Sequence, residues 1–363
     1  MNIIFDNLTS MMQRLIQRLK SLSIFWKGII VGCLILLLLA GSFARKYYLA
    51  VYKPNVLVSK ILYIRTGGDF QQVLDSLVRN HILADLSTFK WVSSQKKYSK
   101  KVLSGAYQIQ KGWNNNQLIN VLRSGKQKSV KVTFNNIRFR EDLAGRLSKY
   151  LEADSTAFFE TLNDDRVAAD LGMSCEEFPM LIIPNTYEFY WNTSPKEFIA
   201  RMKIEYDRFW TNTRKDKAVK LALTPIQVVT IASIVQEESN MNSEKPRIAG
   251  VYINRFKSGW PLQADPTIKY ALGDFQIKRV LTQYLTVDSP YNTYKNAGLP
   301  PGPINFPEIA SVDAVLNAES HQYMYFCAKE DFSGSHNFAK TLSEHNQNAV
   351  RYQNALNKRK IFK

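Results

Sequence analysis

The deciding stretch of this chain reads Thr224-Pro-Ile-Gln-Val-Val-Thr-Ile-Ala-Ser-Ile-Val-Gln-Glu-Glu-Ser239. Threonine suits the N-cap of a helix and proline suits the first helical position, so the stretch predicts a helix that begins here. Its aliphatic residues recur at helical spacing and form one apolar stripe. These residues are Val228, Ile231, Ile234 and Val235. The stripe predicts one buried face.

The two glutamates at the end of this helix are expected to point in different directions. At about 100° per residue, Glu238 lies within roughly 40° of Ile231 and Ile234, whereas Glu237 lies about 100° away on a more polar side. Burial disfavours a charged carboxylate and raises its pKa, as a general acid near neutral pH requires. Glu238 is therefore a candidate catalytic acid; the alternative is a solvated or salt-bridged residue at a frayed helix end.

Composition narrows the class of protein. The chain has 363 residues, a formal net charge of +17, and hydrophobic and charged fractions of 45% and 22%. These fractions are ordinary for globular proteins, so disorder, collagen and a multi-span membrane protein are excluded as the main description. The positive charge favours an acidic partner, either nucleic acid, an anionic bilayer or an acidic polymer. The sequence contains no recognisable helix-turn-helix or RNA-binding signature, so we predict no nucleic-acid partner.

The N-terminal region carries a membrane signal. Residues 28–44 read GIIVGCLILLLLAGSFA, and Trp26, Tyr47 and Tyr48 flank this run where interfacial aromatic residues are common. We predict a transmembrane helix over residues 28–46, with residues 1–27 as a cytoplasmic tail and the rest of the chain outside. A cleaved signal peptide is the alternative, but the segment before the run is long for one.

Residues 54–128 are expected to form a small module. Strand patterns at 61–65 and 105–109 enclose two helical patterns, and a further helix ends near Gly125, which gives β-α-α-β followed by a helix. The opening Tyr63-Ile-Arg-Thr-Gly-Gly-Asp-Phe70 resembles the start of a LysM domain, and that resemblance implies binding of glycans that contain N-acetylglucosamine. A strand, Gly-Asp and a helix are also common in other α+β proteins.

Residues 129–363 are expected to form a larger domain. A strand-like segment at 130–134 precedes helical patterns, and mixed strands and loops follow Asn240. The helical patterns cover residues 140–151, 155–162, 195–217 and 225–239. The fold class is therefore α+β, with a single N-terminal transmembrane helix, a LysM-like β-α-α-β module and a larger mixed α+β catalytic domain.

Polar residues after the deciding helix are candidates for binding or orienting a substrate. Gln263 and Asp265 precede a proline in a rigid turn, while Asn292 and Tyr294 carry groups that suit sugar hydroxyls and N-acetyl groups. The same residue types also serve ordinary turns. His336 lies near the C-terminus, where a lone histidine is more often structural.

The sequence offers no motif for a metal or cofactor. Its three cysteines are isolated, which argues against a zinc site and against a disulfide framework. A glycine-rich phosphate loop is also missing from the sequence. We therefore expect neither a metal nor a cofactor.

Several segments, in order and spacing, together resemble the YceG-like family of endolytic murein transglycosylases. The resemblance covers nearly all of the chain beyond the membrane anchor. The matching segments are Ile183-Pro-Asn-Thr-Tyr187, Ala232-Ser-Ile-Val-Gln-Glu-Glu-Ser239, Val251-Tyr-Ile-Asn-Arg255, Leu262-Gln-Ala-Asp-Pro-Thr267, Tyr291-Asn-Thr-Tyr294, Gly298-Leu-Pro-Pro-Gly302 and the segment of His336 and Phe338.

This resemblance implies cleavage inside peptidoglycan glycan strands, between N-acetylmuramic acid and N-acetylglucosamine, with a 1,6-anhydro end on the product. The family's catalytic glutamate falls on Glu238. Many relatives carry an acidic residue two positions earlier, where this chain has Gln236, and Glu237 remains a lesser competitor for the acid role. The resemblance also implies a bacterial cytoplasmic (inner) membrane location and proximity to wall-synthesis proteins.

Three other functions remain open from the sequence. The first is a hydrolytic muramidase in which Asp265 is the second carboxylate. The second is a non-catalytic, membrane-tethered protein that binds the cell wall. The third is a membrane-tethered nucleic-acid binder, whose affinity would fall steeply with salt.

Overall fold

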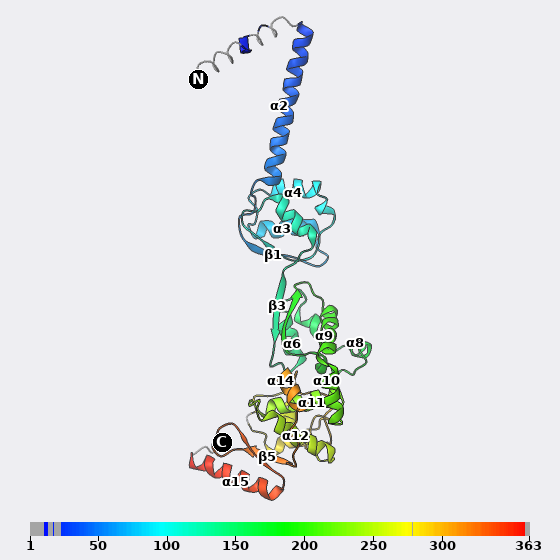
Figure 1. Cartoon of the computed structure of the whole chain (residues 1–363), viewed down its shortest axis with the longest axis vertical. Helices are drawn as coiled ribbons and strands as arrows, with labels where there is room; N and C mark the ends of the chain where they lie inside the picture. The colour runs from blue at the N-terminus through cyan, green and yellow to red at the C-terminus, as the bar shows by residue number, and fades with distance from the viewer. Residues whose placement is uncertain (1–10, 14–16, 18–22, 278, 360–363) are drawn as a thin grey trace. The chain divides into compact units, whose positions relative to one another are not determined.

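The computed structural model describes residues 11–13, 17, 23–277 and 279–359 (Figure 1). The chain divides into two compact units, Met1–Lys128 and Ser129–Lys363. Most of the tail predicted over residues 1–27 lies outside the described residues.

The N-terminal unit begins with the long helix α2 (Ile24–Tyr52). Among the described residues, α2 is the helix that is long and apolar enough to cross a membrane, and its apolar side chains are exposed. The helix continues past the predicted end at Lys46. The reason is tertiary, because the C-terminal turns of α2 pack against two helices of the small module.

The small module has the predicted order of elements. Strands β1 (Lys60–Ile64) and β2 (Gly105–Ile109) pair antiparallel. Helices α3 (Phe70–Arg79) and α5 (Asn115–Ser124) pack against these strands, and α4 (Leu86–Gln95) packs against α5. Each helix starts at a polar cap whose side chain accepts a backbone N–H. A core of aliphatic and aromatic side chains holds the module together.

The first part of the C-terminal unit is built on a two-stranded antiparallel sheet. Strand β3 (Ser129–Phe134) pairs with β4 (Asn185–Tyr190). The helices of this part pack around the core that the sheet contributes to. They are α6 (Arg140–Leu147), α7 (Ser155–Leu162), α8 (Asp165–Asp170) and α9 (Pro195–Phe209), with a short 3-10 turn at Phe178–Leu181.

The single helix predicted over residues 195–217 is wrong. The structure has two helices there, because α9 ends at Phe209 and Thr211 caps a new helix, α10 (Asn212–Lys220). The Thr211 hydroxyl accepts the backbone N–H of Arg214, and this N-cap bond begins α10.

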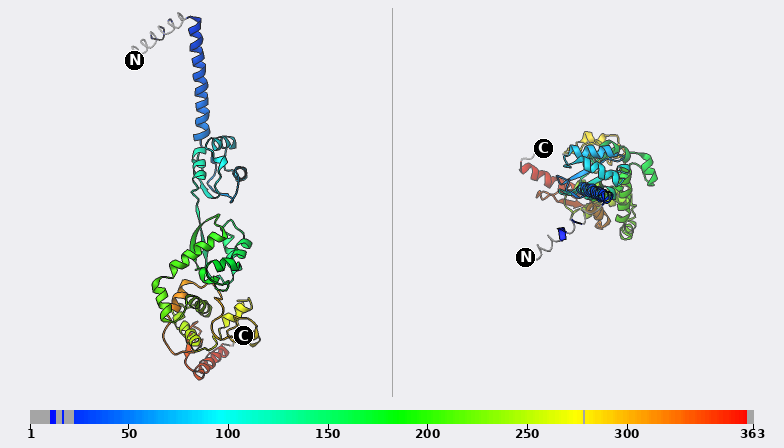
Figure 2. Two further views of the ribbon diagram at one scale, coloured as in Figure 1. Left: turned by 90° about the vertical axis from the view of Figure 1, so that its right-hand side faces the viewer. Right: turned by 90° about the horizontal axis from the view of Figure 1, so that it is seen from above.

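The second part of the C-terminal unit surrounds α11 (Pro225–Glu238), the helix of the deciding stretch. Helices α12 (Lys245–Lys257), α13 (Asp265–Ala271) and α14 (Ile309–Leu316) pack against it. A 3-10 turn at Thr282–Thr286 precedes α14. Helix α15 (Leu342–Lys358), in red in Figure 2, lies against the hairpin of β5 (Tyr325–Ala328) and β6 (His336–Ala339).

Helix α11 begins where the sequence predicts. The Thr224 hydroxyl accepts the backbone N–H of Gln227, the Gln227 side chain accepts the N–H of Thr224, and Pro225 occupies the first turn. The sequence predicted that one face of α11 would be buried. In the structure every residue from Val228 to Val235 is buried. The helix is enclosed by its neighbours, so its polar side also faces protein.

Candidate active site

Glu238 is the last residue of α11, and its carboxyl group meets a tyrosine from the next helix. Tyr252 is fully buried on α12, and its hydroxyl donates a hydrogen bond of 2.6 Å to Glu238 Oε1. The Glu238 residue keeps partial solvent exposure, as a carboxyl group that meets a substrate must. Tyr252 thus fixes one oxygen of a carboxyl group that is only partly accessible.

The surroundings of Glu238 change its charge state near neutral pH. Burial raises the pKa of Glu238 to about 7, and the hydrogen bond from Tyr252 opposes this rise by favouring the anion. The negative charge of Asp265 adds to the rise, whereas Lys269 and Arg255 oppose it. A carboxyl group with a pKa near 7 is able both to release and to accept a proton at neutral pH.

Glu237 has a different environment. Its carboxylate accepts two hydrogen bonds from the Arg138 guanidinium, of 3.2 and 3.0 Å, and a third of 3.0 Å from the side chain of Asn305. The side chain of Glu237 is 15% exposed. Both of its oxygens already serve as acceptors in a bidentate ion pair, which suits an anchor between α11 and the segment after β3.

Asp265 and Tyr294 form a second polar pair. The Tyr294 hydroxyl donates a hydrogen bond of 2.5 Å to Asp265 Oδ1, at the N-terminus of α13. Burial, together with the bond to Asp265, raises the pKa of the Tyr294 hydroxyl above its usual range, so it remains a donor. The charge of Glu238 also acts on Tyr294, and that of Asp265 acts on Glu238. These three side chains share one electrostatic environment.

Gln263 sits in a turn that Thr293 holds in place. Its side chain is exposed and its backbone has a φ of 48°, in the left-handed region. The Gln263 N–H donates to the Thr293 carbonyl at 3.1 Å, and the Thr293 hydroxyl bonds to the N–H of Ala264 and to the Thr267 hydroxyl. The two segments that the sequence singled out are therefore joined into one rigid loop pair.

Asn292 lies inside this loop pair. Its side chain is fully buried, and its amide donates to the carbonyls of Leu285 and Val287 at 2.9 and 2.8 Å. Its oxygen accepts the N–H of Tyr294 at 3.0 Å. Asn292 thereby shapes the backbone that presents Tyr294.

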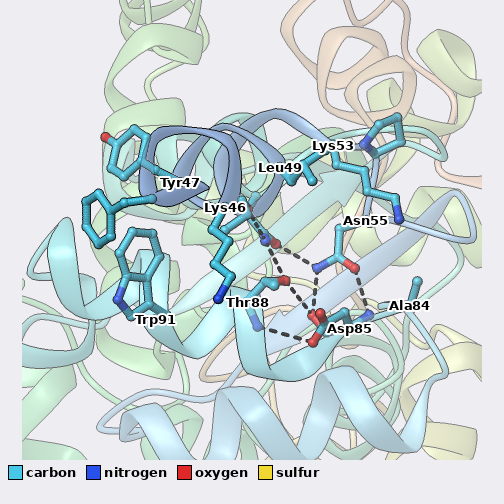
Figure 3. A pocket seen from close by; sticks show the side chains of 13 residues that line it. Lys46, Tyr47, Leu49, Lys53, Asn55, Ala84, Asp85, Thr88 and Trp91 are labelled. Carbon is cyan, nitrogen blue, oxygen red and sulfur yellow. Dashed lines mark hydrogen bonds between the residues drawn. The ribbon is translucent and has the colours of Figure 1, made fainter. Parts of the chain in front are cut away.

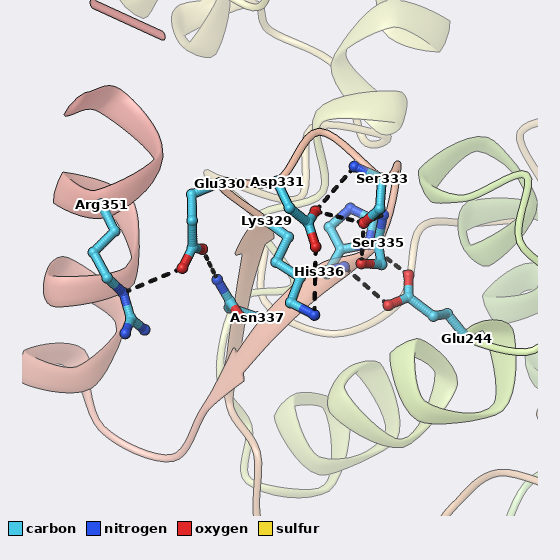
Figure 4. Close-up of polar contacts among 9 residues, drawn as sticks. All are labelled: Glu244, Lys329, Glu330, Asp331, Ser333, Ser335, His336, Asn337 and Arg351. Atoms are coloured by element: carbon cyan, nitrogen blue, oxygen red, sulfur yellow. Dashed lines mark hydrogen bonds and ion pairs between the residues drawn. The ribbon is translucent and has the colours of Figure 1, made fainter. Parts of the chain in front are cut away.

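His336 belongs to a separate polar cluster at the start of β6 (Figure 4). Its backbone N–H and its Nδ1 both contact the carboxylate of Glu244, each at 2.9 Å. The ring of His336 packs edge-to-face on Phe326, which packs in the same way on Tyr252. This row of aromatic rings connects His336 to Tyr252, the residue that binds Glu238.

Sequence patterns assigned no role to three residues of this region, Tyr252, Arg255 and Arg138. Tyr252 and Arg255 lie in the segment 251–255, which was singled out as a whole without a role for either side chain. Arg255 donates to the carbonyls of Met324 and Leu262, at 2.7 and 2.5 Å, and so ties α12 to the hairpin and to the loop of Gln263. Arg138 had no signal in the sequence, because its partner Glu237 is about a hundred residues away.

The described part of the chain has no group of three or more histidine, cysteine or carboxylate side chains that could hold a metal ion. The arrangement offers a carboxyl group with a raised pKa, a tyrosine donor and a neighbouring carboxylate. Such groups suit proton transfer to and from a sugar oxygen.

A family model described as the YceG-like family matches residues 62–351. The chain belongs to the YceG-like family. The resemblance inferred from the sequence segments is therefore confirmed, and the match includes the small module as well as the segments around Glu238.

Relatives within the YceG-like family carry one functional name. The endolytic murein transglycosylase of Bacillus subtilis (strain 168) is 30% identical over 311 residues, which cover 82% of this chain and 85% of the relative. The endolytic murein transglycosylase of Streptococcus pneumoniae (strain ATCC BAA-255 / R6) is 25% identical over 368 residues, or 91% of this chain and 66% of the relative.

A solved structure supports the assignment to the YceG-like family. The crystal structure of a putative yceG-like protein from Listeria monocytogenes matches with a TM-score of 0.53 and 27% sequence identity. The match covers 80% of this chain and 98% of that one. The fold described above is thus the fold of the YceG-like family.

Proposed function

We propose that this chain is a membrane-anchored endolytic murein transglycosylase that cleaves the bond between N-acetylmuramic acid and N-acetylglucosamine inside peptidoglycan strands. The observation that carries the proposal is the carboxyl group of Glu238, whose pKa is raised to about 7 and which is held by Tyr252. Membership of the YceG-like family and the shared name of its relatives support the substrate class.

In the proposed reaction, Glu238 acts first as an acid and then as a base. Its proton passes to the glycosidic oxygen as the bond from that oxygen to the anomeric carbon breaks. The C6 hydroxyl of the muramic residue then attacks the anomeric carbon and gives its proton to the Glu238 carboxylate. The product is a 1,6-anhydro end, no water is consumed, and Glu238 returns to its protonated form.

The neighbouring polar residues have supporting roles in this proposal. Gln263, Asp265 and Tyr294 bind sugar hydroxyls or N-acetyl groups, since all three lie on the loop pair beside Glu238. The buried amide of Asn292 keeps Tyr294 in place. His336 orients the hairpin through Glu244 and supports Tyr252 through the Phe326 ring.

A hydrolytic muramidase is the second candidate, because the negative charge of Asp265 is close enough to raise the pKa of Glu238. In that reaction a second carboxylate activates water or acts as a nucleophile, whereas an internal C6 hydroxyl needs neither. The two reactions differ in their products, since hydrolysis leaves reducing ends without an anhydro ring.

The domain roles are part of the same proposal. Residues 28–46 would span the cytoplasmic membrane, residues 1–27 would lie in the cytoplasm, and residues 129–363 would form the extracytoplasmic catalytic domain. The module of residues 54–128 would bind glycan in a LysM-like manner. A polar cavity of about 350 Å³ in the module, lined by Arg65, Arg79 and Asp75 among others, supports glycan binding. Wall-synthesis proteins are the proposed partners.

Product analysis tests this function directly. Purified sacculi are digested with the full-length chain in detergent, and the soluble and residual glycan ends are identified by mass spectrometry. We expect 1,6-anhydro-muramic ends with wild type and none with Glu238→Gln. Reducing ends without an anhydro ring would support the muramidase instead, and no cleavage by wild type would support a non-catalytic wall-binding protein.

A further inference from the structure

A cavity of about 510 Å³ lies where the C-terminal turns of α2 meet the small module (Figure 3). One wall is a single face of α2 and the C-cap residue that follows it, because Phe43, Lys46, Ala50 and the C-cap Lys53 recur at intervals of three and four residues. The opposite wall comes from α4 and the first residue of α5. None of the residues around Glu238 lines this cavity.

The cavity is apolar on one side and polar on the other. The labelled rings of Tyr47 and Trp91 lie on one side of Lys46 in Figure 3, and Lys53 and Asn55 lie on the other. The Tyr47 and Trp91 rings pack edge-to-face at 5.6 Å. Phe43 belongs to the same cavity and precedes Lys53 by about 15 Å along the helix axis. Polarity therefore rises with distance from the apolar part of α2.

The charged groups favour an anion. Lys46 and Lys53 are both exposed, and the hydrogen bonds and ion pairs of the described residues leave their ammonium groups without a partner. Asp85 is the carboxylate in the lining, and its side chain accepts the N–H groups of Ser87 and Thr88 at the start of α4. Two unpaired cations thus face one carboxylate that is already bound to the module.

The N-termini of two helices add to the positive electrostatic potential in the cavity. Asp85 is the N-cap of α4 and Asn115 is the first residue of α5, and both line the cavity. The N-terminus of a helix carries a partial positive charge and attracts anions. Each of these helices has 10 residues, and the Asp85 carboxylate offsets the dipole of α4, so the N-terminus of α5 contributes the larger share.

The floor of the cavity is fixed by a buried amide network. The Asn115 side chain donates to the Ala50 carbonyl of α2 at 2.8 Å and to the Thr88 hydroxyl at 3.0 Å. The Asn55 side chain donates to Asn115 Oδ1 at 2.8 Å. This network fastens the last turns of α2 to the module, so the backbone that carries Lys46 is held beside the N-termini of α4 and α5.

We propose that this cavity binds an anionic phospholipid of the membrane that α2 spans. The phosphate lies between Lys46 and Lys53, and the hydrocarbon chains run along α2 past Phe43. The apolar run of α2 ends at Ala44, so Lys46 stands at the level of the headgroups. Such a lipid would hold the module against the membrane surface. The proposal rests on α2 as a membrane span and is independent of the glycan-cleaving activity.

Native mass spectrometry of the full-length chain tests the lipid site. The protein is released from detergent micelles that contain either phosphatidylglycerol or phosphatidylcholine, whose choline group neutralises its phosphate. We expect wild type to retain phosphatidylglycerol with at least about tenfold preference. In K46Q/K53Q, retention should weaken about thirtyfold, which corresponds to about 1 kcal/mol for each lysine near an anionic headgroup.

Matched variants control for charge and folding. K100Q/K101Q removes two exposed lysines of the same module that do not line the cavity, and it should bind like wild type. K46R/K53R keeps both charges and should retain the lipid. Equal retention in K46Q/K53Q and K100Q/K101Q, or no preference for phosphatidylglycerol, would overturn the proposal. Binding of inorganic phosphate in lipid-free detergent, with no gain from phosphatidylglycerol, would overturn it as well.

Discussion

Replacing Tyr252 with phenylalanine removes the hydroxyl that donates to Glu238 and leaves the buried ring in place. The hydrogen bond stabilises the ionised carboxylate, so its loss raises the pKa of Glu238 further above about 7. A hydrogen bond to a charged group contributes about 1.5–3 kcal/mol, and one pKa unit corresponds to about 1.4 kcal/mol. Partial solvent exposure of Glu238 reduces the effect, and we therefore expect a shift of about one pH unit.

The shift appears in the pH dependence of glycan cleavage. In wild type the rate should fall as the pH rises through about 7, because Glu238 then loses the proton that it gives to the glycosidic oxygen. In Tyr252→Phe the same fall should occur near pH 8. At pH 8 about one tenth of wild type but about one half of the variant would carry the proton, so the fraction of maximal activity should rise about fivefold.

Initial rates of release of anhydro-muramic fragments from sacculi, measured between pH 5 and pH 9.5, give this profile. Tyr187→Phe is the matched control, because Tyr187 is also buried and loses only a neutral hydrogen bond of 2.7 Å to the Ile183 carbonyl. An alkaline limb that stays at the wild-type position in Tyr252→Phe, or that moves equally in Tyr187→Phe, would show that the Tyr252 hydroxyl does not set the pKa of Glu238. The maximal rate is not the readout, since the variant also loses an orienting contact.

Three further predictions concern stability. Arg138→Ala should lower the free energy of unfolding by about 1–3 kcal/mol in thermal denaturation, because Glu237 is left with little exposure and without its cation. Asn292→Ala should cost about 2–3 kcal/mol and blunt the near-ultraviolet tyrosine signal, because two buried carbonyls lose their donor. Glu238→Gln should be more stable than wild type at pH 8 by about 1–3 kcal/mol and equal to it near pH 4. The raised pKa of Glu238 means that wild type loses stability as the pH rises from about 4.5 to about 7, and a glutamine does not titrate. Unfolding in buffers of pH 4 and pH 8 checks this, and an equal gain at both values would contradict it.

Local sequence patterns predicted the helices well where a cap was present. Thr224 and Pro225 located the start of α11, and the capping box with Gln227 is formed in the structure. The break between α9 and α10 was missed, because the polar residues that follow Trp210 are compatible with a continued helix and mask the new N-cap at Thr211. Apolar periodicity describes one face of a helix but does not show where one helix ends and the next begins.

Helix geometry predicted a buried direction for Glu238 and polar surroundings for Glu237, and Arg138 and Asn305 supply those polar surroundings. Residues on both sides of α11 are buried, and Glu237 meets Arg138 and Asn305 inside the protein rather than open solvent. The sequence does not contain this information, because both partners are distant in the chain and come into contact only through packing.

The sequence alone was enough to predict a membrane-length apolar helix, the capped helix of the deciding stretch and the side of that helix on which Glu238 lies. It did so because caps and periodicity act between residues a few positions apart. The contacts of Tyr252 with Glu238 and of Arg138 with Glu237 are seen only in the folded chain. Those contacts join separate elements, so they depend on how whole helices pack and not on any local pattern.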